Sequence, residues 1–149
     1  MEAMRKIKIV VSAINLRSGG PLSVLNDCIR SLGTDGVDQF EVYAIVHDEK
    51  LCEKFDNVQY ISYPDAAKSY FKRILYEYFF FGKLSKKIKP DVWFSLHDIT
   101  PNVDCKFQVT YCHNPSPFYS PSMKEIFIDF KFFAFTVFKP EYFANNFFE

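Results

Sequence analysis

The sequence lacks a long apolar run and an excess of charge of either sign. Lysine plus arginine number 18, and so do aspartate plus glutamate, in a chain of 149 residues. A balanced charge argues against a general nucleic-acid-binding protein, which normally carries a basic excess. No stretch approaches the ~20 apolar residues that a membrane-spanning helix needs. The apolar run at residues 9–13 is too short for the core of a signal peptide.

Patterns for metal binding and for disulfide bonds are also missing. The four cysteines (Cys28, Cys52, Cys105 and Cys112) include no CxxC pair, and no two of the three histidines lie four residues apart. Zinc sites draw their ligands from such pairs. Together with the missing secretory features, this predicts reduced thiols, a cytoplasmic location and no bound metal. Cys28 and Cys112 are predicted to fill the core, because free cysteine buries readily.

What is present is an alternation of strand-like and helix-like segments. Five runs rich in β-branched and aromatic residues predict strands over residues 7–13, 40–46, 58–63, 91–96 and 107–112. Apolar residues at helical spacing predict a helix over 21–32, and residues 68–89 predict a long, aromatic-rich helix. A short helix is predicted near 51–55. This order is typical of an α/β protein with a Rossmann-like open parallel sheet and helices on both faces.

A glycine turn links the first predicted strand to the first predicted helix, in the stretch NLRSGGPLSVL. Gly19 and Gly20 tolerate positive φ and allow close approach to the backbone, and Pro21 suits the first position of a helix. A helix start of this kind attracts anions. Two interpretations remain open: a plain tight turn, or a backbone cradle for a phosphate or a sugar hydroxyl, assisted by Arg17 and Ser18.

Polar loops also follow the fourth and fifth predicted strands. In an open parallel sheet, ligands gather beyond the carboxyl ends of the strands, where all three loops are expected to meet. His97 and Asp98 are either an oriented pair or a cap of the next turn. His113 is followed by Asn-Pro-Ser-Pro, whose prolines stiffen the loop. It either donates to a ligand oxygen or is hydrogen-bonded inside the core.

Several enzyme motifs are absent from the chain. The glycine turn is neither GxGxxG nor a Walker A loop, which counts against a nicotinamide-dependent oxidoreductase and a P-loop NTPase. No serine lies in a GxSxG turn. His47, in IVHDEK, is predicted to lie in an exposed loop. The pattern favours binding of an oxygen-rich ligand over attack by a protein nucleophile.

Three segments together resemble the N-terminal half of bacterial family 4 glycosyltransferases: KIVVSAINLRSGGPLSVL, PDVWFSLHDITPNV and YCHNPSPF. The resemblance covers the chain up to about Tyr119. It implies a GT-B enzyme whose two Rossmann-like domains face each other across a cleft. Such enzymes retain anomeric configuration and transfer a sugar from a nucleotide-sugar to a glycan or lipid-linked acceptor in capsule, O-antigen or other surface polysaccharide synthesis. They need no cofactor and no metal held by a DxD pair.

The resemblance also implies roles for individual residues. Gly19 and Gly20 match the glycine turn that lies near the donor phosphates and the acceptor. His113 matches the histidine that contacts the transferred sugar, and it is the expected catalytic residue. The remaining expected substrate- or donor-binding residues are Arg17, Ser18, His97, Asp98, Asn114 and Ser116.

The resemblance divides the chain into an incomplete acceptor-side domain over residues 1–121 and an aromatic-rich helical tail over 122–149. The family's C-terminal donor-binding domain is absent, so the chain alone is expected to be inactive. The tail is expected to pack against that domain, to be a core helix without its partner, or to contact the inner face of the plasma membrane. The alternatives to an enzyme fragment are a non-catalytic carbohydrate- or protein-binding module and, less favoured, a flavodoxin-type domain.

Overall fold

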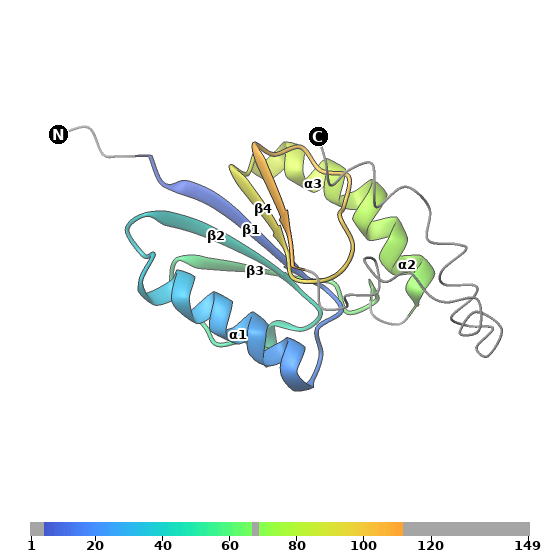
Figure 1. Cartoon of the computed structure of the whole chain (residues 1–149), viewed down its shortest axis with the longest axis horizontal. Coiled ribbons are helices and arrows are strands. Elements are labelled where there is room, and N and C mark those ends of the chain that lie inside the picture. Colours follow the sequence, from blue (N-terminus) through green and yellow to red (C-terminus); the bar gives the residue numbers. More distant parts are fainter. Residues whose placement is uncertain (1–4, 67–68, 112–149) are drawn as a thin grey trace, which may run out of the picture. The chain divides into compact units, whose positions relative to one another are not determined.

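The computed structural model describes residues 5–66 and 69–111. Its centre is a parallel sheet with the strand order β3-β2-β1-β4-β5 (Figure 1). The five strands are β1 (Ile7–Ala13), β2 (Phe40–Val46), β3 (Val58–Ser62), β4 (Val92–Ser95) and β5 (Phe107–Thr110). Every neighbouring pair runs parallel. This confirms the predicted α/β class and the open parallel sheet.

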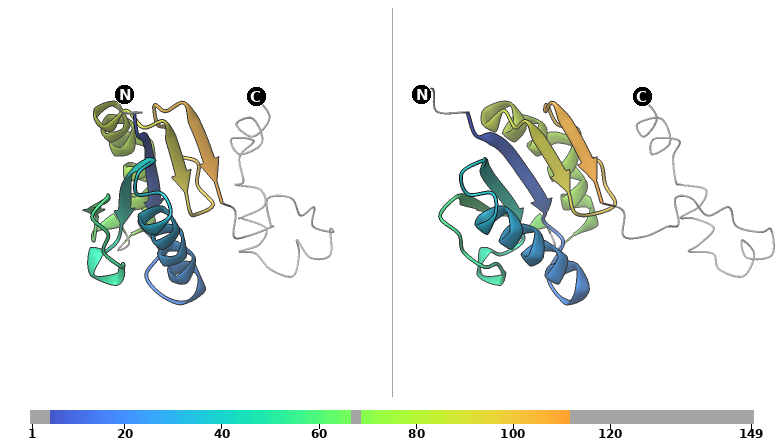
Figure 2. Two further views of the ribbon diagram at one scale, coloured as in Figure 1. Left: turned by 90° about the vertical axis from the view of Figure 1, so that its left-hand side faces the viewer. Right: turned by 60° about the vertical axis from the view of Figure 1, so that its left-hand side comes forward.

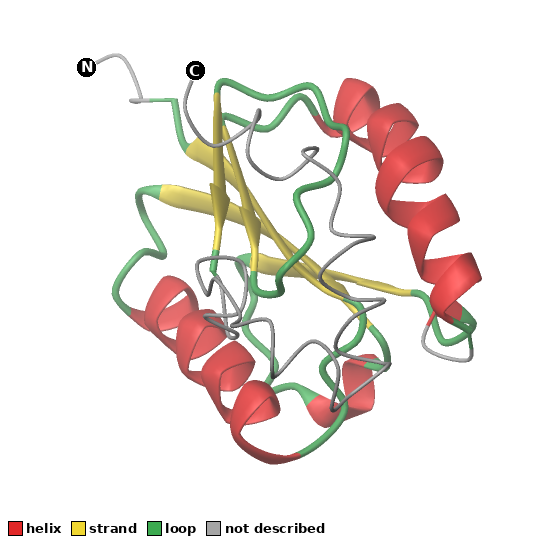
Figure 3. Ribbon diagram, turned by 45° about the vertical axis from the view of Figure 1, so that its right-hand side comes forward, coloured by secondary structure: helices red, strands yellow, loops and turns green. Residues whose placement is uncertain are grey.

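The central strand β1 is buried on both faces of the sheet. Its side chains alternate between the faces, as they do in any strand. Val11 and Ala13 belong to the core cluster that includes helix α1, while Val10 and Ile14 belong to the cluster that includes Phe81. Accordingly α1 lies on one face, and the helical segment α2–α3 lies on the other (Figures 2 and 3). A run of consecutive apolar residues is therefore the correct signature of this strand.

Helix α1 (Gly19–Thr34) extends beyond both ends of the predicted helix over 21–32. Its inner face buries Leu25 and Ile29 completely or nearly so. Cys28 lies half-buried beside them and packs against the same core. Burial raises the pKa of the Cys28 thiol to about 11, so this cysteine is a core residue, as predicted.

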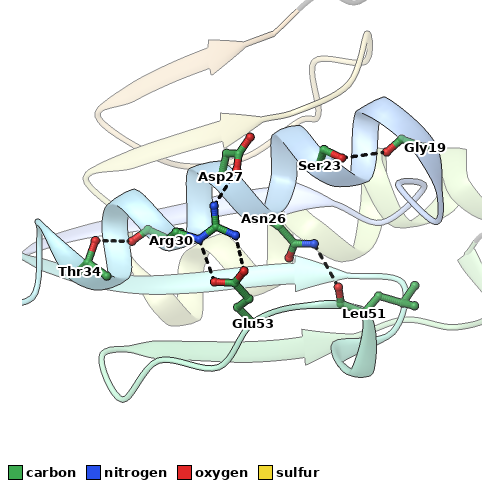
Figure 4. Close-up of polar contacts among 8 residues, drawn as sticks. All are labelled: Gly19, Ser23, Asn26, Asp27, Arg30, Thr34, Leu51 and Glu53. Carbon is green, nitrogen blue, oxygen red and sulfur yellow. Dashed lines mark hydrogen bonds and ion pairs between the residues drawn. The ribbon is translucent and has the colours of Figure 1, made fainter.

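Polar contacts anchor α1 to the segment between β2 and β3 (Figure 4). The Arg30 guanidinium donates through Nε to Glu53 Oε2 at 3.0 Å and pairs through a second nitrogen with Oε1. One turn earlier, Asn26 Nδ2 donates to the Leu51 carbonyl oxygen at 3.2 Å. These contacts join the middle of α1 to the segment that follows β2.

The short helix after β2 begins earlier than predicted. It is a single 3-10 turn, η1 (Glu49–Leu51), rather than a helix over 51–55. The Asp48 side chain caps it by accepting a hydrogen bond from the Lys50 N–H at 2.9 Å. The capping carboxylate sets where the turn starts.

The long helix predicted over 68–89 corresponds to a helical segment over 70–88 that contains a π turn. It consists of α2 (Tyr70–Leu75), a π turn η3 (Tyr76–Phe80) and α3 (Phe81–Ile88). In the π turn, the Phe81 N–H donates to the Tyr76 carbonyl, one residue further along than in an α-helix. The wider turn places both Glu77 and Phe81 against the sheet, where each is 0% exposed.

Asp91 brings two cationic side chains and one backbone N–H together at the amino edge of the sheet. Lys106 Nζ lies 2.6 Å from Oδ1, the Lys8 backbone N–H donates to Oδ2 at 3.0 Å, and the Arg5 guanidinium donates to both oxygens at 3.1 Å. The hydrogen bond from Lys106, followed by that from the Lys8 backbone, lowers the pKa of Asp91 from 3.8 to about 2.

Replacing Asp91 by asparagine is expected to make the free energy of unfolding less dependent on pH under acidic conditions. Because the pKa of Asp91 is lower in the folded than in the unfolded state, its stabilising contribution is present above the unfolded value of 3.8 and disappears as the pH falls toward about 2. Wild-type protein should therefore lose stability more steeply over that range than Asp91→Asn. Urea unfolding at a series of pH values measures the two slopes, and equal slopes would contradict the assignment.

Candidate functional site at the ends of β1 and β4

The carboxyl ends of β1 and β4 form the point where the strand order reverses. From β1 the chain passes through α1 to β2 on one side, whereas from β4 it passes to β5 on the other side. The two strands are parallel neighbours, with Ser12 beside Ser95 in register. In open α/β sheets a crevice forms where neighbouring connections diverge in this way. The loops that begin after Ala13 and after Ser95 therefore leave the same edge side by side.

The glycine turn lies at this edge and leads directly into α1. Gly19 has a φ of 67°, a left-handed conformation that favours glycine. Ser18 is the N-cap but makes no capping hydrogen bond through its side chain, and the first turn contains no acidic residue. Arg17 is exposed, as are Ser18 and both glycines. The first N–H groups of a helix have no acceptor within the helix, so this turn has the electrostatics of an anion site.

Space is open above the two glycines. A Cβ atom added at Gly19 or at Gly20 would meet no heavy atom within 4 Å. Pro21 is the third residue of α1, not the first as predicted. It is tolerated there because the N–H that proline lacks has no intrahelical acceptor in the first turn. Gly20 therefore has no neighbour in the described chain that explains its small size.

His97, which follows β4 by two residues, is enclosed rather than open to solvent. Its residue is 1% exposed. The Ile99 N–H donates to Nδ1 at 3.4 Å, which makes Nδ1 the acceptor and assigns the proton of the neutral ring to Nε2. The ring thus caps the turn that follows it, one of the two roles expected from the sequence. Asp98 is half-buried.

Glu77, in the π turn, is the partner of His97 that sequence reasoning missed. Its Oε1 lies 3.0 Å from His97 Nε2 and 3.8 Å from Nε of Arg73, one helical turn away. The distance between Glu77 Oε1 and His97 Nε2 is that of an ion pair, but the two groups are not aligned for a hydrogen bond. Neither Glu77 oxygen has a hydrogen-bonded partner among the described residues. In the sequence, Glu77 could have been recognised as the single carboxylate inside the aromatic run YEYFF. If such an acid is fully buried, it requires a positive or donating partner.

Two buried serines lie beside this pair. Ser12 Oγ is 3.4 Å from His97 Nε2, and Ser95 Oγ has no hydrogen-bond partner within the described ranges. Both residues are 0% exposed. A catalytic serine–histidine–acid triad places the serine and the acid on opposite ring nitrogens. Here Ser12 and Glu77 both approach Nε2, so the arrangement positions a loop and does not activate a nucleophile.

The loop between β4 and β5 is held against α2–α3 along its length. The Asn102 N–H donates to the Glu77 carbonyl at 3.3 Å, and the Asp104 N–H donates to Ser85 Oγ at 2.9 Å. Gly82 permits this approach, because a Cβ there would lie 3.0 Å from the Asn102 carbonyl oxygen. The helical segment α2–α3 therefore holds the loop between β4 and β5 in place at the carboxyl edge of the sheet.

The remaining predicted residues are distributed as follows. His113, Asn114 and Ser116 lie outside the described residues, as does the predicted boundary at 121/122. The described residues all fall within one unit of the chain, Met1–Cys112. His47 follows β2 and is half-buried, not exposed as predicted.

Neither protein-family models nor curated proteins give a match to this chain. Among residues 5–66 and 69–111, no three histidine, cysteine, aspartate or glutamate side chains are placed to hold a metal ion. Within the same residues, no helix combines the length and apolarity required to cross a bilayer. The assignment of function therefore depends on the site's geometry and on the three sequence segments quoted above.

Proposed function

We propose that this chain is the acceptor-side domain of a retaining, GT-B-type glycosyltransferase that moves a sugar from a nucleotide-sugar to a glycan or lipid-linked acceptor. The observation that carries the proposal is the position of the glycine turn at the topological switch point, beside the loop that follows β4. The segments that resemble family 4 glycosyltransferases contribute both of these loops. The proposal places the enzyme in surface polysaccharide synthesis, on the cytoplasmic side of the plasma membrane.

The roles in this proposal follow from the chemistry at the edge. Backbone N–H groups at Gly19 and Gly20, with the Arg17 side chain, bind a diphosphate or a sugar hydroxyl, and stabilise negative charge as it develops on the leaving group. His97 and Glu77 hold the loop after β4 in place. His113, with Asn114 and Ser116, contacts the transferred sugar. No step requires a covalent bond to the protein or a metal ion.

Replacing Gly20 by valine is expected to weaken diphosphate binding without unfolding the protein. A Cβ atom at this position meets no heavy atom of the protein within 4 Å. The added side chain therefore fits the fold but fills the space that a ligand would use. Backbone amide spectra recorded during titration with inorganic pyrophosphate, UDP-glucose or GDP-mannose should shift at residues 17–23 in wild-type protein. In Gly20→Val the apparent affinity should fall on the order of tenfold or more, because backbone contacts to an anion need close approach.

Ser31→Val is the matched control, since Ser31 is exposed on α1 far along the helix from the glycine turn. It should bind like wild type. Sugar transfer is measured in the same samples, and binding without turnover is expected from this chain alone. Shifts confined to the lysines at the end of α3, or equal shifts in Gly20→Val, would refute the site. Robust turnover would refute the assignment to the acceptor side.

One observation favours a second candidate, a non-catalytic carbohydrate- or protein-binding module. Both ring nitrogens of His97 approach protein groups, so the described edge offers donors for binding more clearly than a group for acid–base chemistry. Such a module would bind free oligosaccharides with no preference for a nucleotide-linked sugar. The same titration, extended to oligosaccharides, separates the two candidates.

A further inference from the structure

The outward face of α2–α3 carries three exposed phenylalanines that the proposed function does not use. Phe71 is 69% exposed, Phe79 is 64% exposed and Phe80 is 52% exposed. The opposite side of the same segment buries Glu77 and Phe81 against the sheet. Figure 3 shows the segment lying along the sheet with its other side turned away from the strands. These rings therefore lie mostly in solvent, and of the three Phe80 also contacts Tyr76, with ring centroids 5.2 Å apart.

Lysines share this outward face. Lys83 and Lys87 follow Phe79 at successive intervals of four residues, the spacing of one helical face, and both are exposed. Lys72 and Lys86 are exposed as well. Between residues 70 and 88 the one acidic residue, Glu77, is buried. The outward face, defined by the three phenylalanines and these four lysines, is therefore aromatic and purely cationic, and we call it the aromatic–basic face.

We propose that the aromatic–basic face of α2–α3 docks onto an anionic lipid bilayer. Phenylalanine rings buried at the boundary of headgroups and acyl chains gain hydrophobic free energy, and lysines pair with anionic headgroups. Long lysine side chains keep their ammonium groups at headgroup level while their stems lie along the apolar surface. The helix lies in the plane of the membrane surface and does not cross it, in keeping with its mixed composition.

The lysine content distinguishes a bilayer from a protein partner. Lysine is depleted at protein–protein interfaces, where aromatic residues and arginine are enriched. Here Lys83 continues the line of Phe79 on the same face, so a protein surface covering the rings would also have to bury an ammonium group. A bilayer accepts both groups at different depths. The aromatic–basic face lies entirely on the described helical segment, so docking onto a bilayer does not require the glycine turn to bind a diphosphate.

Co-sedimentation of the full chain with vesicles tests the proposal. Wild-type protein should pellet with phosphatidylcholine vesicles that contain phosphatidylglycerol, less with pure phosphatidylcholine, and less at high salt. The double variant Phe79→Ser/Phe80→Ser should lower the partition coefficient on the order of tenfold or more. Lys83→Gln/Lys87→Gln should lower it several-fold and remove about half of the salt dependence, because two of the four lysines remain.

Phe107→Ser is the matched control, because Phe107 is 67% exposed but lies on β5. It should bind like wild type. As a second measurement, Phe79→Trp should shift its emission to shorter wavelength on vesicles, whereas Phe107→Trp should not. Absence of wild-type pelleting, as expected for a protein partner, would overturn the proposal. Unchanged binding by the Phe79/Phe80 variant, or equal loss in the Phe107 variant, would do so too.

Discussion

Replacing His97 by leucine is expected to lower the free energy of unfolding by about 1–3 kcal/mol, the usual cost of leaving a buried polar group without its partner. The substitution leaves the Glu77 carboxylate, which is 0% exposed, with Arg73 as its nearest cation at 3.8 Å. The 3.8 Å contact with Arg73 remains in the variant, but a buried carboxyl group that has lost its nearest polar neighbour is still costly. Urea unfolding at neutral pH, followed by circular dichroism, measures the loss.

The double variant Glu77→Leu/His97→Leu distinguishes a stranded charge from lost packing. If the cost arises from the unpaired carboxylate, removing that carboxylate as well should restore much of the stability, as replacement of buried ion pairs by apolar residues often does. Ser12→Ala is the control, because its 3.4 Å contact with His97 is long and its removal should cost about 1 kcal/mol or less. A loss of less than about 1 kcal/mol in His97→Leu would contradict this account of the pair. A double variant no more stable than His97→Leu would contradict it as well.

The strands and the position of the edge were within reach of the sequence. Buried parallel strands are short apolar runs, and residues 7–13 and 40–46 show that pattern without interruption. Their boundaries match β1 and β2 to the residue. The rule that loops follow the carboxyl ends of parallel strands then brought the glycine turn and the loop containing His97 to one edge.

The environment of His97 was beyond reach because it depends on a residue 20 positions earlier in the chain. Glu77 lies inside a π turn, on the side of the helical segment that is buried, and a π turn has no reliable sequence pattern. The sequence instead predicted one long, aromatic-rich helix over 68–89. The burial of His97 is thus a tertiary effect, whereas its position after β4 is a local one.

Three consecutive phenylalanines illustrate the same limit. Residues 79, 80 and 81 are identical in chemistry, and their order along the chain does not say which one enters the core. In the structure Phe81 is 0% exposed, while Phe79 is 64% exposed. Phe81 shares the buried face of α3 with Ser85 and Ile88, and this face assigns one ring to the core and its neighbour to the surface.

Phe81→Ala is therefore expected to destabilise the protein by about 3–5 kcal/mol, the range for large-to-small changes in a packed core. The Phe81 ring lies 5.5 Å from that of Trp93 and 6.0 Å from that of Tyr63, centre to centre, so its loss opens a cavity between α3 and the sheet. Urea unfolding followed by circular dichroism measures the change without relying on Trp93 fluorescence, which the substitution itself perturbs.

Phe79→Ala is the matched control two residues away. Because its ring is mostly in solvent, its removal should change stability by about 0.5 kcal/mol or less, yet it should weaken binding to anionic vesicles. Phe81→Leu, which keeps an apolar side chain, should fall between the two alanine variants. If Phe79→Ala destabilises the protein as strongly as Phe81→Ala, the outward face is part of the core and cannot be a docking surface. The pair of variants thus separates what holds α3 to the sheet from what α3 presents to a membrane.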